Sequence, residues 1–72
     1  MKYSLVGVDG NAYALMGYTM DAMKKCGFTG VDVDNMLKDA KSSNYNHLIC
    51  VCADWIDRCN EKIGATDDEE EE

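Results

Sequence analysis

The sequence contains no proline, and its 72 residues include only one phenylalanine, one tryptophan and one histidine. Without proline, every residue after Met1 keeps a backbone hydrogen-bond donor, and no helix has a built-in kink. No apolar run approaches the roughly 20 residues that a membrane-spanning helix needs. The apolar stretch 3–8 is interrupted by Asp9 and Gly10 and is too short for the core of a secretory signal. We therefore expect a cytoplasmic protein without membrane attachment.

A basic surface is also missing. The chain has 7 Lys and Arg against 14 Asp and Glu, a formal net charge of −7. Six of the acids form the run 67–72, so the rest of the chain has 14 − 6 = 8 acids against 7 bases, a net charge of −1. Because nucleic-acid binders usually carry a basic face, we expect no direct nucleic-acid binding. The acidic run repels itself and is expected to be disordered, which divides the chain into a helical domain at 1–64 and an acidic tail at 65–72.

The four cysteines are Cys26, Cys50, Cys52 and Cys59. An even number in a short chain can indicate disulfides, but only in an oxidising compartment. On one helix Cys52 and Cys59 would lie about 10 Å apart, whereas a disulfide needs Cα atoms within about 7 Å. Cys50 and Cys52 would point to opposite sides. We expect free thiols that act as small hydrophobic side chains.

Apolar spacing at helical period predicts a mainly α fold with three helices. The first spans about 12–25, begins after Asp9 or Asn11 as the N-cap and ends at Gly27 as a left-handed C-cap. The second begins after Thr29, which with Asp32 forms an imperfect capping box, and ends near residue 41. The third spans about 45–63 and ends at Gly64. The stripes expected to be buried are Ala12, Leu15, Met16, Thr19, Ala22, Met23 and Cys26, then Val33, Met36, Leu37 and Ala40, then Tyr45, Leu48, Ile49, Cys52, Trp55, Ile56, Cys59 and Ile63.

Short connections between these segments predict a compact three-helix bundle. Residues 3–8 mix β-forming residues in rough alternation, which indicates a short N-terminal strand or extended arm. A single strand has no partner in a helical chain. The segment therefore either packs flat on the helices or pairs with a symmetry mate.

Gly17 lies in the middle of the first predicted helix, where glycine costs about 1 kcal/mol relative to alanine. We expect an offsetting contact, such as the close approach of another helix. Tyr13, Gly17 and Met20 share a flank outside the main stripe, with Tyr18 nearby. Exposed Met and Tyr are favoured at interfaces, although a second layer of core explains them equally well. With the outer-side residues of the third helix, the predicted partner-binding residues are Tyr13, Gly17, Tyr18, Met20, His47 and Cys50.

Chemical sites are weakly indicated. His47 and Cys50 could share a helix face, but Cys52 and Cys59 would lie on the other side, so the spacing does not suit zinc. A nucleophilic Cys50 would need a base, an orienting group and an enclosed pocket, for which a small bundle offers little room. Residues 32–35 lack the glycine and terminal Glu of a calcium loop, and residues 7–10 lack a phosphate-loop lysine. We predict no catalytic, cofactor-binding or metal-binding residues.

Two segments carry a family resemblance: Asp-Gly-Asn-Ala-Tyr-Ala-Leu-Met-Gly at 9–17 and Asp-Ala-Lys-Ser-Ser-Asn-Tyr-Asn-His-Leu at 39–48. They resemble a group of short proteins of bacteria, phages and mobile elements that carry DGNAF-like and ATSGDYDHLL-like segments. This chain differs by Tyr13 in place of Phe and by Asn46 where Asp is frequent. The resemblance covers about residues 3–60. It implies a mobile-element setting and supplies no catalytic residues.

These observations predict a non-enzymatic protein-binding module that modulates or inhibits a host protein, such as part of a defence system. Small size, the lack of a catalytic constellation and the spare apolar surface favour this reading. One alternative is a homo-oligomeric regulator that sequesters a small ligand, such as a nucleotide, between subunits. Another is a thiol-based enzyme or redox sensor, which would require a reactive Cys50. The expected partner is thus a protein or a second copy of the chain.

Overall fold

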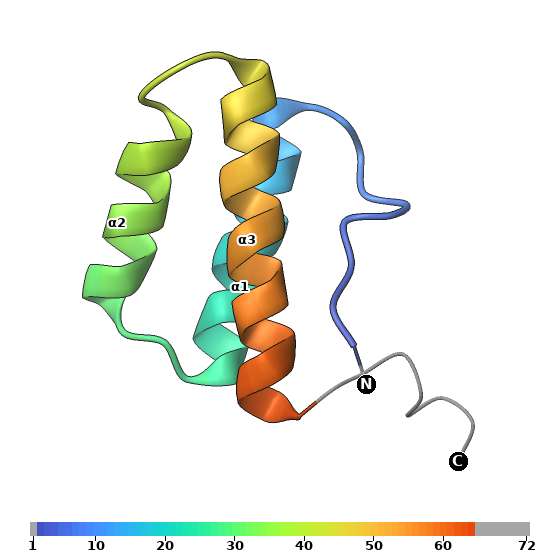
Figure 1. Cartoon of the computed structure of the whole chain (residues 1–72), viewed down its shortest axis with the longest axis vertical. Helices are drawn as coiled ribbons and strands as arrows, with labels where there is room; N and C mark the ends of the chain where they lie inside the picture. Colours follow the sequence, from blue (N-terminus) through green and yellow to red (C-terminus); the bar gives the residue numbers. More distant parts are fainter. Residues whose placement is uncertain (1, 65–72) are drawn as a thin grey trace.

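The computed structural model describes residues 2–64, which form three packed α-helices and contain no strand. These are α1 at Ala12–Cys26, α2 at Gly30–Ala40 and α3 at Tyr45–Ile63. Figure 1 shows α3 in front of α1, with α2 on one side and the N-terminal arm on the other. None of the helices in the described part is long and apolar enough to cross a membrane. The predicted disorder of 65–72 concerns residues outside the described part.

Side-chain and glycine caps set the helix ends where the sequence predicts them. The Asn11 side chain accepts from the Tyr13 N–H at 2.8 Å, which makes Asn11 the N-cap of α1 rather than Asp9. Thr29 and Asp32 form a complete capping box on α2. Gly27 and Gly64, with φ of 96° and 76°, end α1 and α3 in the left-handed conformation that glycine adopts without strain.

The core lies between the inner faces of all three helices, with Met23, Met36, Cys52 and Cys59 fully buried. The predicted stripe of α3 is wrong at three positions, because Tyr45, Ile49 and Ile63 are 46%, 36% and 43% exposed. Tyr45 is the first residue of α3 and Ile63 the last, so both lie at ends of the helix. Conversely, α3 buries Val51 and Asn60, since it packs against α2 on one side and the N-terminal arm on the other.

The N-terminal arm, residues 3–8, packs on the helices of its own chain, the first of the two arrangements that the sequence leaves open. Tyr3, Leu5 and Val8 are half-buried against the core. The Ser4 N–H donates to the Tyr18 hydroxyl at 3.0 Å, and the Tyr3 and Tyr18 rings meet edge to face. The arm therefore adds a fourth, non-helical layer to the globule.

Candidate functional site

The six predicted partner-binding residues do not form one surface. Tyr13 is 79% exposed on α1, whereas Tyr18 and Met20 are half-buried and pack against the core. His47 and Cys50 lie on α3, toward α2. The structure therefore divides the set between an α1 flank and the α2–α3 face.

Gly17 lies in open space. A Cβ atom built on it would meet no atom within 4 Å beyond its own helix backbone and its chain neighbours. The predicted close approach of another helix is wrong within the described chain. Within residues 2–64, no close packing against this position offsets the helix-destabilising effect of glycine.

One groove lies where α1 and α3 begin and α2 ends, and we call it the tyrosine groove. Its volume is about 460 Å³. Tyr13 and Tyr45 line it, and the Tyr45 hydroxyl donates a hydrogen bond to the Gly10 carbonyl. Among the described residues that line it, Lys41 is the only charged one. These described residues are Ala12, Tyr13, Met16, Ala40, Lys41, Ser43, Asn44, Tyr45 and Leu48.

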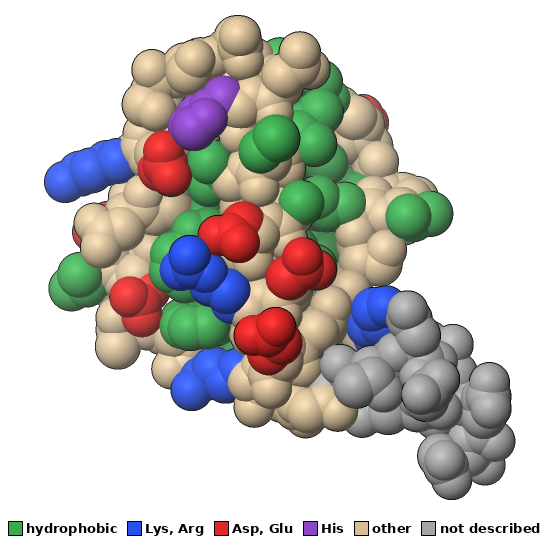
Figure 2. Space-filling model, viewed as in Figure 1, with side chains coloured by type: hydrophobic (Ala, Val, Ile, Leu, Met, Phe, Trp, Pro, Cys, Tyr) green, Lys and Arg blue, Asp and Glu red, His purple; other side chains and the backbone are tan. Residues whose placement is uncertain are grey.

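A second groove of about 310 Å³ separates α2 from α3, and we call it the α2–α3 groove. Asn35 and Asp39 form the α2 wall, and the remaining lining comes from α3: Cys50, Val51, Asp54, Trp55 and Arg58. The Arg58 guanidinium binds Asp54 at 3.0 Å and lies 4.5 Å from the Trp55 ring. Figure 2 shows the acidic side chains over this face, with basic side chains among them and the histidine at its upper end.

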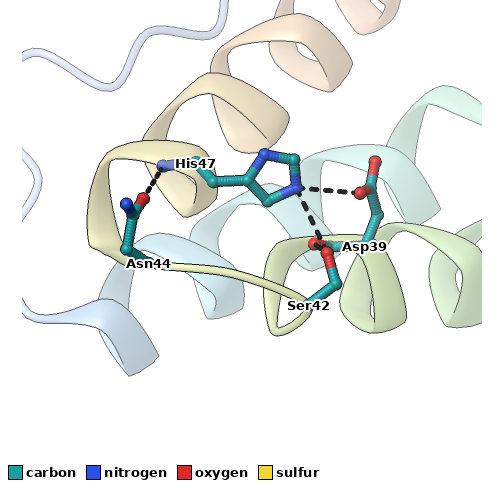
Figure 3. Close-up of polar contacts among 4 residues, drawn as sticks. All are labelled: Asp39, Ser42, Asn44 and His47. Atoms are coloured by element: carbon teal, nitrogen blue, oxygen red, sulfur yellow. Dashed lines mark hydrogen bonds and ion pairs between the residues drawn. The ribbon is translucent and has the colours of Figure 1, made fainter.

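His47 ties the end of α2 to the start of α3 (Figure 3). Its Nε2 lies 2.9 Å from Asp39 Oδ1 and 3.3 Å from Ser42 Oγ, and the Ser42 hydroxyl donates to the Asp39 carbonyl at 2.6 Å. A serine–histidine–aspartate relay needs the acid on one ring nitrogen and the hydroxyl on the other. Here both partners share Nε2. The geometry is that of a structural link and not of a proton relay.

The thiols divide into three buried and one exposed. Cys26, Cys52 and Cys59 are buried, whereas Cys50 is exposed on α3. Burial raises the pKa of the Cys52 thiol, and burial together with nearby Cys26 raises the pKa of Cys59 to about 12. Cys50 makes no hydrogen bond with His47 in the described part. Nor do three or more His, Cys, Asp or Glu side chains within residues 2–64 gather where they could hold a metal ion.

Sequence reasoning missed several lining residues of these grooves. Tyr45 follows the helical apolar stripe, so periodicity placed it inside. Asp39 and Asp54 lie on different helices, and no spacing rule within one helix connects them. The exposed positions of Asp54 and Arg58, four residues apart, were the available signal for a paired charge. No protein-family model, curated protein or solved structure matches this chain.

Proposed function

We propose that this chain is a non-enzymatic module that binds another protein through the tyrosine groove. The exposure of Tyr13, which lines the tyrosine groove and is 79% exposed, carries this proposal. Tyrosine offers a large apolar area with little side-chain freedom to lose, and it is enriched at protein interfaces. The groove supplies apolar side chains from Met16 and Leu48 beneath it.

The polar groups favour binding over catalysis. The His47 cluster uses a single ring nitrogen for both of its partners. The exposed Cys50 has no hydrogen-bonded base among the described residues. A nucleophile needs an adjacent base that is itself oriented by a third group. The side chains of the described part therefore serve more readily as contacts than as reactants.

The setting of the proposal comes from the sequence. The resemblance of 9–17 and 39–48 to proteins of phages and mobile elements supports a role in modulating or inhibiting a host protein. The six acids of 67–72 would steer association with a basic partner, since long-range attraction raises association rates. The partner protein would then be recognised by contact at the groove and attracted by charge.

Affinity purification from producing cells with mass spectrometry tests this proposal. We expect a protein that is recovered with the wild-type chain and lost with Tyr13→Ala. Val31→Ala is the matched control, because Val31 is 68% exposed on α2 and lies outside the groove. Binding must then be reproduced with the two purified proteins. Equal recovery by both variants, with helical circular dichroism unchanged, would remove the groove from the proposal.

The homo-oligomeric regulator remains the second candidate, because Gly17 leaves the outer face of α1 open to a second copy. Light scattering separates the two functions. A dimer that Tyr13→Ala or Gly17→Arg converts to a monomer would favour self-association over a host partner.

A further inference from the structure

We propose that Cys26 and Cys59 form an intramolecular disulfide when the protein reacts with a hydroperoxide, which joins the end of α1 covalently to α3. Cys26 is the last residue of α1, and Cys59 lies in the C-terminal part of α3. The tyrosine groove lies where these two helices begin. This oxidation site is therefore separate from the proposed binding surface.

The thiols of Cys26 and Cys59 are neighbours in the core. The Cys26 thiol donates to the Cys59 carbonyl oxygen at 3.6 Å, in a buried contact between two helices. Burial, together with a hydrogen bond between the two side chains, raises the pKa of Cys59 to about 12. The sulfur of Cys26 thus contacts both the backbone and the side chain of Cys59. A disulfide needs such neighbours, whose side chains face each other and whose Cα atoms lie within about 7 Å.

The other two cysteines are placed differently. Cys50 is exposed on α3, whereas Cys52 is buried and hydrogen-bonds Thr19 of α1. Thr19 lies seven residues before Cys26, and Cys52 lies seven residues before Cys59. Cys52 thus contacts α1 about 10 Å away from Cys26, which exceeds the reach of a disulfide. The fold therefore selects one pairing.

The N-terminal arm covers this pair. Burial, and after it the nearby Cys26, raises the pKa of the Tyr3 hydroxyl, and Cys59 acts in the same direction. The Tyr3 ring therefore lies near both thiols. Asn60, which follows Cys59 in α3, binds the Tyr3 backbone and holds the arm there. Local opening of the arm is thus the motion that admits an oxidant to the pair.

Cys26 is the thiol that reacts first, because it is 9% exposed whereas Cys59 is fully buried. With hydrogen peroxide, the Cys26 sulfur attacks one oxygen, the O–O bond breaks, and the departing hydroxide takes the Cys26 proton to become water. Cys59 then attacks the sulfur of the sulfenic acid, so that the S–S bond forms and the S–O bond breaks. The second hydroxide takes the Cys59 proton. Two thiols thus lose two electrons and two protons, and one peroxide becomes two waters.

The cross-link should make the domain harder to unfold. It joins residues 33 positions apart, so it restricts the unfolded chain more than a local bridge would. The folded chain needs little adjustment, because the Cys26 thiol already contacts Cys59. Rotation of the Cys26 side chain brings the sulfur atoms together without a change in the helical backbone. Oxidation therefore stabilises the fold, and reduction returns it to its former stability.

Peptide mapping of the oxidised full-length chain tests the pairing. Wild type and Cys50→Ser, which lacks the exposed thiol that could link two copies, are treated with hydrogen peroxide, and free thiols are then blocked with iodoacetamide in urea. Trypsin without reductant separates the thiols, because Cys26 falls in 26–38, Cys59 in 59–62, and the other two cysteines in 42–58. We expect 26–38 linked to 59–62 as the main disulfide. The midpoint of thermal unfolding should rise by at least about 5 °C, and dithiothreitol should reverse the rise.

Variants localise the effect. Cys26→Ser and Cys59→Ser should each abolish both the link and the rise in midpoint. Cys52→Ser is the matched control, because Cys52 is equally buried on the same helix as Cys59, and it should keep both. Asn60→Ala should speed formation of the link at least about threefold by releasing the arm, whereas Asn46→Ala should leave the rate unchanged. If a core variant fails to fold, the peptide map of the wild-type chain still decides the pairing.

Three results would overturn this assignment: a main link that includes 42–58, oxidation of Cys26 or Cys59 to sulfinic acid without a link, or a link that lowers the midpoint. An equal rate in Asn60→Ala and wild type would contradict the role of the arm as a cover. None of these results bears on the tyrosine groove, because Tyr13→Ala tests that groove through recovery of the partner. The two proposals therefore fail separately.

Discussion

Asn60 binds the backbone of Tyr3 with both ends of its side-chain amide. The Tyr3 N–H donates to Asn60 Oδ1 at 2.7 Å, and Asn60 Nδ2 donates to the Tyr3 carbonyl at 2.9 Å. Asn60 is only 6% exposed, so its amide needs internal partners. The pair joins residues 57 positions apart and fixes the N-terminal arm on α3.

Replacing Asn60 should release the arm. Asn60→Ala leaves the Tyr3 backbone groups without their partner, and we expect the free energy of unfolding to fall by about 1–3 kcal/mol. Hydrogen exchange at the Tyr3 and Ser4 amides should accelerate more than exchange in α1. Urea denaturation and amide exchange measure the two effects.

Asn46→Ala is the control for this prediction. Asn46 is exposed near the start of the same helix, and its side chain makes no hydrogen bond in the described part. Equal destabilisation by both substitutions would show that the hydrogen bonds between the Asn60 side chain and the Tyr3 backbone contribute nothing specific.

Alkaline pH should destabilise the protein. Burial is the main reason that the pKa of Cys59 rises from 9.0 to about 12 in the folded state. At pH values between 9.0 and about 12, the unfolded chain therefore loses a proton from Cys59 that the folded chain keeps. The free energy of unfolding then falls as pH rises, by at most about 1.4 kcal/mol per pH unit for this group. Burial also raises the pKa of Cys52. Urea denaturation at pH 7 and pH 10 should show this loss, and Cys59→Ala should reduce the slope of unfolding free energy against pH. A slope that Cys59→Ala leaves intact would count against this account.

Alkylation should distinguish the cysteines. Cys50 is exposed, whereas Cys52 and Cys59 are buried with raised pKa values. Since the thiolate is the reactive form, iodoacetamide at pH 8 should modify Cys50 first. Mass spectrometry of digested protein gives the order, and denaturation in urea should remove it. Early modification of Cys59 in the folded protein would contradict the described packing.

Two glycine substitutions should act in opposite directions. Gly17→Ala should stabilise the chain by about 0.5–1 kcal/mol, because a Cβ there meets nothing within 4 Å and alanine favours the helix. Gly27→Ala should destabilise it by about 1–2 kcal/mol, because Gly27 has φ of 96°. Thermal denaturation compares them. If Gly17→Ala stabilises the fold but weakens partner binding, Gly17 belongs to the contact surface.

Removal of 67–72 should slow partner association at low salt and change it little at high salt. The six acids act at long range, and salt screens that attraction. Stopped-flow measurements with the recovered partner test this. If the truncated and full-length chains associate with the partner at the same rate at both salt concentrations, the tail acts in solubility alone.

Helix boundaries were predictable because local chemistry sets them. Asn11 and Thr29 cap the N-termini of α1 and α2, and Gly27 caps the C-terminus of α1, as their residue types predict. Each cap bonds groups within a few residues of itself. The three-helix core followed from periodicity in the same way. The fold could therefore be inferred without knowledge of contacts between distant residues.

The grooves and the arm could not be inferred in this way. The hydrogen bonds between Tyr3 and Asn60, and the placement of Asp39 and Asp54 in one groove, depend on how separate elements meet. Periodicity assigns one buried stripe to each helix, but α3 contacts α2 on one side and the N-terminal arm on another. Contact with the arm buries Asn60.

The anchoring of Tyr3 beside Asn60 has a practical consequence for protein engineering. The described chain starts and finishes at the same pole of the molecule, as Figure 1 shows, while Tyr45 and its groove occupy the opposite pole. A fluorescent or affinity tag joined beside Lys2 or directly after Gly64 would thus start at the pole away from the tyrosine groove. Insertions at the turn around residues 42–44 would instead crowd it.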